Sequence, residues 1–398
     1  MKNVIVTLEY RFKRTPDGKI WTEMSFQYPF WQRYLNIFDQ VIVVARVQEV
    51  ESLSTKHHRV DGDNVHIEAL PYYHGPLDFF KKKSLIAKAL NAITLKYKNE
   101  SIIMRVGSPI ADILQNELVK QGRPYGLEVV GDPWDVFRPG TFNNPLRPFM
   151  RVFFAWKLKQ QCSKAVALSY VTDQALQARY PGRNGSFSIG ASSINLESEH
   201  LVNKAKSFEK GKVFKFIYVG TLEQLQKAPD VLIKAAHGLS QTHKNFELHI
   251  IGEGKCKPEL QELSKDLGIS KNVIFHGMVP AGDGVRKLLD ASDVFVLPSR
   301  GEGLPRAMIE AMARALPCIG SDIGGIRELI PSEDIVEVGS VSDLAGKMRN
   351  FIENQDQLTE KSGRNLEKAK NYLSPILTKR RNDYYGHIRN LTTNWLNE

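Results

Sequence analysis

Short runs of apolar residues alternate along this chain with longer stretches in which apolar and polar residues follow a helical period. In the first half, the runs that predict buried strands are residues 4–8, 41–45, 65–70, 101–104, 125–130 and 165–168. In the second half, they are residues 214–219, 246–251, 273–275, 294–297 and 318–319. Strands that alternate with helices form parallel sheets covered on both faces. The pattern therefore predicts an α/β protein with two doubly wound halves that face each other across a cleft.

A polar stretch at residues 180–186 marks the approach to a boundary between the halves, because its glycines and proline are typical of a loop. We expect the boundary in the region 190–210. The prediction is an N-terminal domain at residues 1–195, a C-terminal domain at residues 196–374 and a final helix at residues 375–398.

The final helix has its own start signal and its own anchors. Pro375 cannot continue the helical pattern that precedes it, so a new helix begins there. Tyr384, Tyr385 and Trp395 are large side chains that can pack against another surface. We expect this helix to cross back over the domain junction.

The composition is that of a globular protein large enough for two domains. The chain has 398 residues, of which 42% are hydrophobic and 25% are charged. No apolar run approaches the roughly 18 residues that span a bilayer. The first run ends at Glu9, which indicates a core strand rather than a secretory signal, so we expect a cytoplasmic protein. Three widely spaced cysteines indicate reduced thiols rather than a zinc site.

The formal net charge of +10 is unevenly distributed. Residues 1–190 hold 26 Lys and Arg against 17 Asp and Glu, so nearly all of the excess lies in the first half. Such a half can attract nucleic acid, anionic lipid headgroups or phosphorylated substrates. Charge alone does not choose among these partners.

Three loops of the first half follow predicted strands, where open sheets bind their ligands. Gly18 lies in a basic turn after the first strand, Arg105 ends the strand at 101–104, and Asp132 follows the strand at 125–130. The first of these loops has a single glycine, so it does not fit a dinucleotide-binding fingerprint. Its position nevertheless places Gly18 among the predicted donor-binding residues.

The stretch at residues 299–317 carries most of the chemistry. It follows the strand at 294–297, and Pro305 opens a run of good helix formers, so it predicts a strand, a loop and a helix. Glu302 then lies in the loop and Glu310 on the helix. The free amides at the helix start suit a phosphate or diphosphate, so the loop offers an anion site between two carboxylates.

The helix predicted after this loop also has a closely packing face. Ala307, Ala311 and Ala315 recur every four residues, and Met308 and Met312 widen the apolar face. We expect this face to lie against the sheet. Glu310 then needs a partner.

Two glutamates separated by seven residues, after a strand that ends Leu-Pro-Ser and before Pro-Cys-Ile-Gly-Ser-Asp-Ile-Gly-Gly-Ile-Arg-Glu, resemble the donor-site signature of the family-4 retaining glycosyltransferases. Lys227 after the glycine loop at 220, the glycines at 252 and 254, and the pair His276-Gly277 match that family in order and spacing. The resemblance covers residues 210–345 well and the first domain loosely.

The resemblance implies a GT-B architecture and a metal-independent, retaining transfer of sugar from a nucleoside-diphosphate-sugar, with no cofactor. Glu310 would hold the ribose hydroxyls, Glu302 the donor sugar, and Lys227 the diphosphate together with loop amides. The leaving phosphate would accept the proton of the acceptor. The residues expected around the donor are Gly220, Thr221, Gly252, Gly254, His276, Gly303, Leu304, Pro305 and Arg306.

Two departures from the family pattern change the charge of residues expected near the reacting groups. Thr221 stands where the family usually has arginine, and Asp132 stands where many members have histidine. We count Asp132 and Arg105 with Glu302 and Lys227 as predicted catalytic residues. Arg105 would reach across the closed cleft and replace the missing cation, or it would pair with a neighbouring acid such as Asp132.

Other classes of protein fit less of the sequence. Asp61-Gly-Asp63 is the nearest approach to the metal-binding motif of other glycosyltransferases, but it precedes a strand and reads as a turn. A nucleotide-sugar epimerase or a sugar phosphorylase could share the architecture. A nucleic-acid-binding protein would fit the charge, but no recognised motif supports one.

The expected partners are a nucleotide-sugar donor and a glycan or lipid-linked acceptor in surface-polysaccharide assembly. An anionic membrane surface is a further expected partner, because Phe79 and Phe80 precede Lys81, Lys82 and Lys83, and residues 147–164 form a basic helix rich in aromatic side chains. The protein would then be peripheral on the inner face of the membrane.

Overall fold

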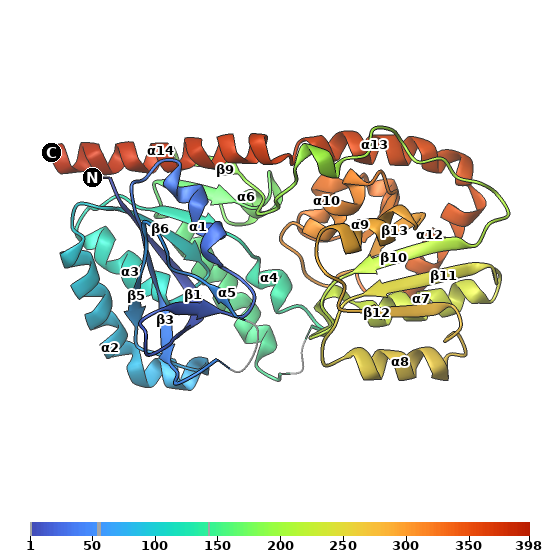
Figure 1. The fold of residues 1–398 in the computed structure, drawn as a ribbon, viewed down its shortest axis with the longest axis horizontal. Coiled ribbons are helices and arrows are strands. Elements are labelled where there is room, and N and C mark those ends of the chain that lie inside the picture. Colours follow the sequence, from blue (N-terminus) through green and yellow to red (C-terminus); the bar gives the residue numbers. More distant parts are fainter. Residues whose placement is uncertain (1, 54–56, 142–143) are drawn as a thin grey trace.

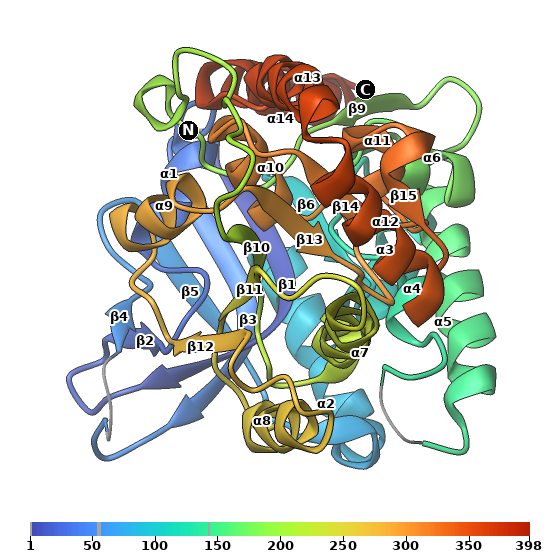
Figure 2. The ribbon, with the colours of Figure 1, turned by 90° about the vertical axis from the view of Figure 1, so that its right-hand side faces the viewer.

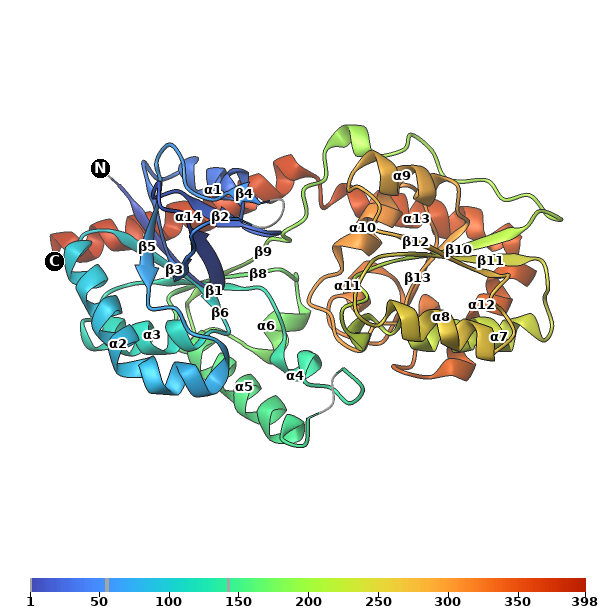
Figure 3. The same ribbon diagram turned by 60° about the horizontal axis from the view of Figure 1, so that its bottom comes forward.

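Two α/β domains lie side by side in the computed structural model, which describes residues 2–53, 57–141 and 144–398 (Figure 1). Each domain has one sheet with helices on both faces (Figures 1 and 3). The predicted α/β fold with two Rossmann-like domains is therefore confirmed.

The N-terminal sheet joins nine strands among the described residues, and its central part is parallel. The chain runs outward from β1 through β3 and β5 on one side, and from β6 through β7, β8 and β9 on the other. The direction of winding thus reverses between β1 and β6. The strands are β1 (Val4–Arg14), β2 (Ile20–Thr22), β3 (Val41–Glu49), β4 (His58–Arg59), β5 (Val65–Leu70), β6 (Ser101–Val106), β7 (Gly126–Val129), β8 (Ala167–Tyr170) and β9 (Phe187–Gly190).

The first strand is longer than the sequence pattern predicts. We expected a strand at residues 4–8 and a flexible turn after it, but β1 continues to Arg14 and pairs antiparallel with β2. Phe12 is fully buried while its neighbours are not, so this part alternates as a strand with one covered face does. Gly18 therefore lies in an exposed hairpin turn, with φ at +80°, and not in a loop at a parallel strand end.

Helices cover both faces of the N-terminal sheet. α2, α3 and α5 share one apolar cluster, to which they contribute Leu90, Leu114 and Leu158, and Figure 3 shows them together on one side of the sheet. α1 and the C-terminal helix α14 cover the other face through Trp31 and Tyr384. The helices are α1 (Tyr28–Leu35), α2 (Gly75–Lys96), α3 (Pro109–Lys120), α4 (Pro133–Val136), α5 (Arg147–Cys162) and α6 (Ala175–Arg179).

The C-terminal sheet is parallel throughout, in the order β12-β11-β10-β13-β14-β15. Its direction of winding reverses between β10 and β13. The strands are β10 (Phe214–Val219), β11 (Phe246–Ile251), β12 (Val273–Gly277), β13 (Val294–Leu297), β14 (Cys318–Ser321) and β15 (Ile335–Val336). The helices are α7 (Pro229–Ser240), α8 (Lys257–Asp266), α9 (Asp283–Asp290), α10 (Arg306–Ala313), α11 (Ile326–Leu329), α12 (Val341–Glu353) and α13 (Leu358–Lys370).

The last helix, α14 (Ser374–Asn397), leaves the C-terminal domain and runs along the N-terminal domain (Figure 1). Tyr384 and Tyr385 are buried there, and the Tyr385 hydroxyl donates to Oε1 of Glu128 at 3.1 Å. The expected domain boundary at 195/196 falls in the connection between β9 and β10. The chain thus passes between the domains twice.

Candidate active site

The centre of the site is an ion pair between two loops of the C-terminal domain. The Nζ of Lys227, in a short 3-10 turn after β10, lies 2.6 Å from Oε1 of Glu302, in the loop after β13. The Ser299 hydroxyl donates to the same oxygen at 3.0 Å. The two loops flank the point where winding of the sheet reverses, which is where open α/β sheets bind ligands. The sequence placed both residues at the chemistry, and the structure brings them together.

The loop that carries Glu302 is held between the two domains. A side chain at Gly303 would contact Val171 and the carbonyl of Val130 in the N-terminal domain, at 3.3 and 3.4 Å. From the other side, the amide of Gly325 donates to the carbonyl of Gly303 at 2.7 Å. The backbone of the loop is therefore positioned by both domains, and Glu302 faces the junction between them.

Beside this pair lies a pocket of about 540 Å³ that both domains line. Gly220, Thr221 and Gly252 from strand ends and Glu310 from α10 contribute to it, and Met24 reaches it from the N-terminal domain. Lys227 adjoins the pocket, because a side chain at Gly220 would meet its Cδ at 2.5 Å. The site thus joins a pocket of ligand size to a cation and a carboxylate.

Glu310 is a partly buried carboxyl group at the pocket wall. Burial raises its pKa, and the guanidinium groups of Arg306 and Arg286 act in the opposite direction. Such a group needs a hydrogen-bonding partner in the pocket when it is ionised. Glu310 thus has the properties expected of a residue that binds hydroxyl groups of a ligand.

The glycines predicted at the donor allow close packing of backbone. A side chain at Gly252 would lie 1.9 Å from the carbonyl oxygen of Gly220, and one at Gly254 would lie 2.1 Å from the amide of Glu223. Only glycine fits at such approaches. The loops after β10 and β11 can therefore bring their amides to one side of the pocket.

The helix after the loop is shorter than the pattern of small residues predicts. α10 ends at Ala313, and Ala315 lies beyond it with a φ of +57°. Ala307 and Ala311 remain on the helix, and Met308 and Met312 are fully buried in the domain core as expected. Pro305 caps the helix, which begins at Arg306.

His276 is placed outside the pocket. Its Nε2 lies 2.9 Å from Nδ1 of His249, the two rings stack, and Nε2 of His249 lies 3.0 Å from Glu247. Partial burial and the neighbouring His249 lower the pKa of His276. Its predicted role at the donor has no geometric support here, and Gly18, in its hairpin turn, has none either.

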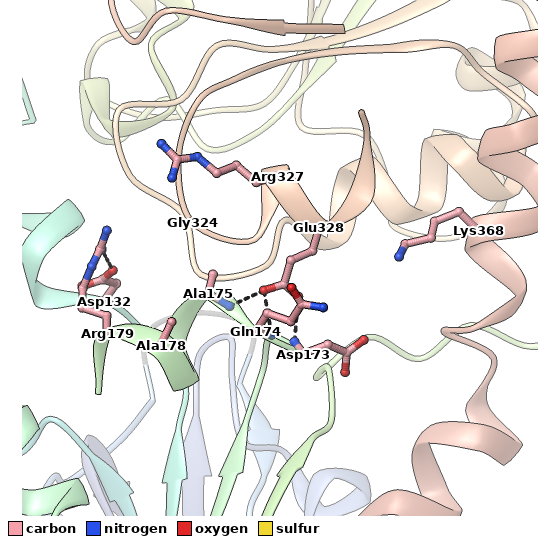
Figure 4. Close-up of a pocket in the computed structure, with 10 residues that line it drawn as sticks. All are labelled: Asp132, Asp173, Gln174, Ala175, Ala178, Arg179, Gly324, Arg327, Glu328 and Lys368. Carbon is pink, nitrogen blue, oxygen red and sulfur yellow. Dashed lines mark hydrogen bonds and ion pairs between the residues drawn. The ribbon is translucent and has the colours of Figure 1, made fainter. Parts of the chain in front are cut away.

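Asp132 is engaged in contacts within its own domain. It is 3% exposed, caps α4 by accepting from the amide of Trp134, and pairs with Arg179 and the Tyr180 hydroxyl. Burial raises its pKa. These contacts occupy both carboxylate oxygens, and Asp132 and Arg179 also line a cavity of about 690 Å³ together with Arg327 of the C-terminal domain (Figure 4). The predicted catalytic role of Asp132 stays a prediction.

Arg105 pairs with Glu128 and not with Asp132. Both side chains are about one-tenth exposed, and Glu128 also accepts from the hydroxyls of Tyr34 and Tyr385. Phe30 lies against the guanidinium at 5.2 Å from the ring centroid. In this arrangement the positive charge of Arg105 is neutralised within the N-terminal domain and does not reach the pocket.

The structure adds a contact that the sequence did not reveal. Glu328, from α11, accepts hydrogen bonds from the amides of Asp173, Gln174 and Ala175 at the start of α6 in the N-terminal domain (Figure 4). It lines a second cavity of about 690 Å³, which Arg327 and Lys368 also line. Glu328 is the last residue of the stretch that resembles the family's donor-site signature. Its amide partners are distant in sequence, so no local pattern predicts these contacts.

No helix within residues 2–53, 57–141 and 144–398 is long and apolar enough to cross a membrane. Over the same residues, no group of three or more His, Cys, Asp or Glu side chains is arranged to hold a metal ion.

The fold and the site define a two-domain GT-B protein with a donor-type pocket in its C-terminal half. Residues 201–370 match the family model described as glycosyl transferases group 1. The chain therefore carries a glycosyl transferases group 1 domain over these residues. The three alternatives, a nucleotide-sugar epimerase, a sugar phosphorylase and a nucleic-acid-binding protein, are not favoured.

Among the curated relatives, one matches most of the chain and another matches about a third of it. Protein CapJ of Staphylococcus aureus is 29% identical over 357 residues, which are 86% of this chain and 87% of that protein. The lipopolysaccharide 1,6-galactosyltransferase of Salmonella typhimurium is 32% identical over 151 residues, 36% of this chain and 41% of that protein. The solved structure of sucrose-phosphate synthase from Thermosynechococcus elongatus has a TM-score of 0.70 at 13% identity and covers 98% of this chain and 99% of that chain, which shows the shared fold.

Proposed function

We propose that this protein transfers a sugar from a nucleoside-diphosphate-sugar to a glycan or lipid-linked acceptor, with retention of configuration and without a metal, in the assembly of a surface polysaccharide. The observation that carries the proposal is the Lys227–Glu302 pair at the reversal point of the C-terminal sheet, beside a pocket that ends at Glu310. The similarity to a lipopolysaccharide galactosyltransferase supports the polysaccharide acceptor.

The groups of this site can stabilise a departing diphosphate. As the bond from the anomeric carbon to the phosphate oxygen breaks, negative charge grows on the leaving group, and the ammonium of Lys227 is available to it. Gly303 and Leu304 lie in the loop directly before α10, whose N-terminal end carries partial positive charge, and their amides would bind the diphosphate. Fixed positive charge in a partly dehydrated site lowers the barrier by electrostatic stabilisation.

Proton transfer needs no further side chain in this proposal. The acceptor hydroxyl approaches the anomeric carbon from the face that the phosphate leaves, so the new bond has the original configuration. A phosphate oxygen takes the hydroxyl proton as the new carbon–oxygen bond forms. Glu302 holds the donor sugar and its positively charged neighbour in position, and Glu310 holds the ribose hydroxyls.

The experiment that tests the proposal combines binding and turnover. Among a panel of nucleoside-diphosphate-sugars, one should raise the unfolding temperature, since a ligand at 100 times its Kd adds about 2.7 kcal/mol of stability. Free nucleoside diphosphate should then be released only when an acceptor is added and EDTA should not stop it. Lys227→Met should abolish release in the same assay. Stabilisation by none of the panel would overturn the proposal.

An association with the membrane surface belongs to the same proposal. On α5, Phe149, Phe153 and Trp156 are exposed by 67, 39 and 54%, and they recur at helical spacing on one face. α2, on the same side of the sheet, exposes Phe80 beside its lysines, whereas Phe79 packs against the core. Exposed aromatic side chains with basic neighbours are typical of helices that rest on anionic lipid.

A further inference from the structure

A third cavity of ligand size, of about 450 Å³, lies over the extended part of β1 in the N-terminal domain. The strands β1, β2 and β3 form its floor at the edge of the sheet that Figure 2 shows with β2 and β4. Ile20 and Val47 are buried on the opposite face of these strands, so the cavity is built mainly on the polar face, although Phe12 also lines it. It is lined by Glu9, Arg11, Lys13, Trp21, Glu23, Arg46, Gln48 and Tyr72, among others.

Two arginines stand next to each other on this floor. Arg11 of β1 and Arg46 of β3 are paired in register, and like charges on neighbouring strands repel each other. Arg46 is 8% exposed and pairs with Glu9 at 2.9 Å, while Arg11 lies 2.8 Å from Nδ1 of His74. Lys13 pairs with Glu23 at 2.6 Å. Glu9 and Glu23 therefore balance the charges of Arg46 and Lys13, and the positive charge of Arg11 has no carboxylate partner among the residues described here.

The guanidinium of Arg46 is held in a fixed position, and one of its N–H groups is unpaired. One Nη donates to the carbonyl of Tyr73 at 3.0 Å, and the guanidinium lies 4.2 Å from the centroid of the Tyr73 ring. Its Nε is buried and has no hydrogen-bond partner among the described residues. Because this nitrogen is shielded from solvent, Arg46 contributes positive charge to the cavity rather than a free N–H group.

Aromatic rings flank this charge. Trp21 and Tyr72 line the cavity, and the indole of Trp21 is fixed by donating to the Thr15 hydroxyl at 3.0 Å. A fixed ring beside polar donors is a surface on which the apolar face of a sugar can stack. The cavity thus combines the recognition of a sugar ring with the recognition of an anion.

The cavity is also close to the reaction site along the chain. β1 pairs with β6 up to Thr7, and Glu9 follows, at the point where winding of the N-terminal sheet reverses. Glu23 lines this cavity and the next residue, Met24, lines the donor pocket. A chain of sugars can therefore extend from the donor pocket over β2 into the cavity.

We infer that this cavity binds a sugar of the acceptor that carries an anionic group, with Arg11 and Arg46 holding the anion and Trp21 stacking on the ring. The inference rests on the proposed function, since it names the chemistry of the acceptor in that transfer. The anion can be a carboxylate on the sugar or a phosphate attached to it, and both are tested below.

Calorimetric titration of the full chain with trigalacturonate, maltotriose and glucose 1-phosphate tests the inference. At least one anionic sugar should bind, and maltotriose should bind about tenfold more weakly or not at all. Arg11→Gln should weaken the anionic sugar by about tenfold, since a charge-assisted hydrogen bond is lost. Trp21→Ala should weaken it as well, which separates sugar recognition from charge. Every titration contains the nucleoside diphosphate at saturation, so that the donor pocket is filled, and inorganic phosphate should then bind more weakly than the anionic sugar does.

Lys120→Gln is the matched control, because it removes one exposed positive charge from the end of α3. It should change binding less than about twofold. Equal affinity for maltotriose, wild-type affinity in Arg11→Gln, or equal binding of inorganic phosphate with the donor pocket filled would each overturn the inference. The shift in unfolding temperature that the nucleotide-sugar causes is measured separately, in the wild type and in Arg11→Gln. If both proteins show this shift but the anionic sugar does not bind, the inference fails and the proposed function stands. If the wild type shows no shift, the proposed function fails.

Discussion

At the scale of single residues, the two glutamates of the donor site have different surroundings. Glu302 pairs with Lys227 at the domain junction, whereas Glu310 lies at the wall of the pocket. Glu302→Gln should lower transfer by about 100-fold or more, because the charge that holds the sugar and the lysine is lost, with nucleotide affinity nearly unchanged. Glu310→Ala should instead weaken nucleotide binding. Calorimetry with nucleoside diphosphate and a turnover assay separate the two, and an equal loss of affinity in both variants would contradict the division of roles.

The partly buried carboxyl of Glu310 makes stability depend on pH. Its pKa in the folded protein is above the ordinary 4.5, mainly because of burial, so the folded state binds the proton more tightly than the unfolded chain. The contribution of this group to stability is complete below the ordinary pKa and is lost as the pH rises through the raised value. Glu310→Gln, which carries no charge, should therefore unfold at a higher denaturant concentration than the wild type at pH 7, and the difference should vanish below pH 4.5. If the difference in denaturation midpoint between the two proteins is the same at every pH in this range, Glu310 does not have a raised pKa in the folded protein.

Variants of Arg105 test whether its charge stabilises the fold or takes part in the transfer reaction. Its partner Glu128 is buried with it, so Arg105→Ala leaves a carboxylate without its cation and should cost about 3–5 kcal/mol. The double variant Arg105→Met with Glu128→Gln should recover much of that loss. Urea unfolding measures the cost. If the double variant is stable and transfers sugar normally, the predicted role of Arg105 at a phosphate is wrong.

At the scale of elements, the loops after β10 and β11 depend on a close approach of backbone. Gly252→Ala places a methyl group 1.9 Å from the carbonyl of Gly220, so these loops must separate. We expect a loss of about 1–3 kcal/mol of stability and weaker nucleotide binding. Gly346→Ala, in the exposed part of α12 where nothing lies within 4 Å, is the control and should be neutral or stabilising by up to about 1 kcal/mol. Equal effects of both changes on nucleotide affinity would show that the approach is unimportant.

The strand, loop and helix at residues 294–313 could be predicted from sequence because their signals are local. A buried run, a proline and helix formers lie within twenty residues, and the chemistry lies between them. The extension of β1 was missed because the turn signals Thr-Pro-Asp-Gly before residue 19 outweighed the alternation around Phe12. The pairing of strands β1 and β2 turns that alternation into a strand.

The network around Arg105 was out of reach for a different reason. Its members Tyr34, Arg105, Glu128 and Tyr385 come from α1, β6, β7 and α14, so only the folded topology brings them together. Glu328 and its three amide partners are a second case. A single sequence indicates periodicity and motifs, but it contains no signal for a contact between distant segments.

At the scale of the whole molecule, one side of the N-terminal domain should bind anionic membranes. Lys81→Gln, Lys82→Gln and Lys83→Gln together should weaken co-sedimentation with anionic vesicles by about two orders of magnitude, since each well-placed charge contributes about 1 kcal/mol. Salt should release the wild type as it screens the attraction. The triple change of Lys210, Lys212 and Lys271 to Gln, on the exposed surface of the other domain, should have little effect. Equal binding to vesicles without anionic lipid, or none at all, would leave an acceptor away from the membrane as the better hypothesis.

The path of α14 has a consequence for how the chain reaches its native state during synthesis. The Ser101 hydroxyl donates to that of Thr392 at 3.1 Å, across 291 positions of sequence, and Tyr384 and Tyr385 complete the core on one face of the N-terminal sheet. While a ribosome is still making the C-terminal domain, that face is without its cover. The C-terminal domain can close on its own contacts, whereas the N-terminal domain must wait with apolar surface exposed until α14 has emerged, so the half that is translated first is the half that is completed last.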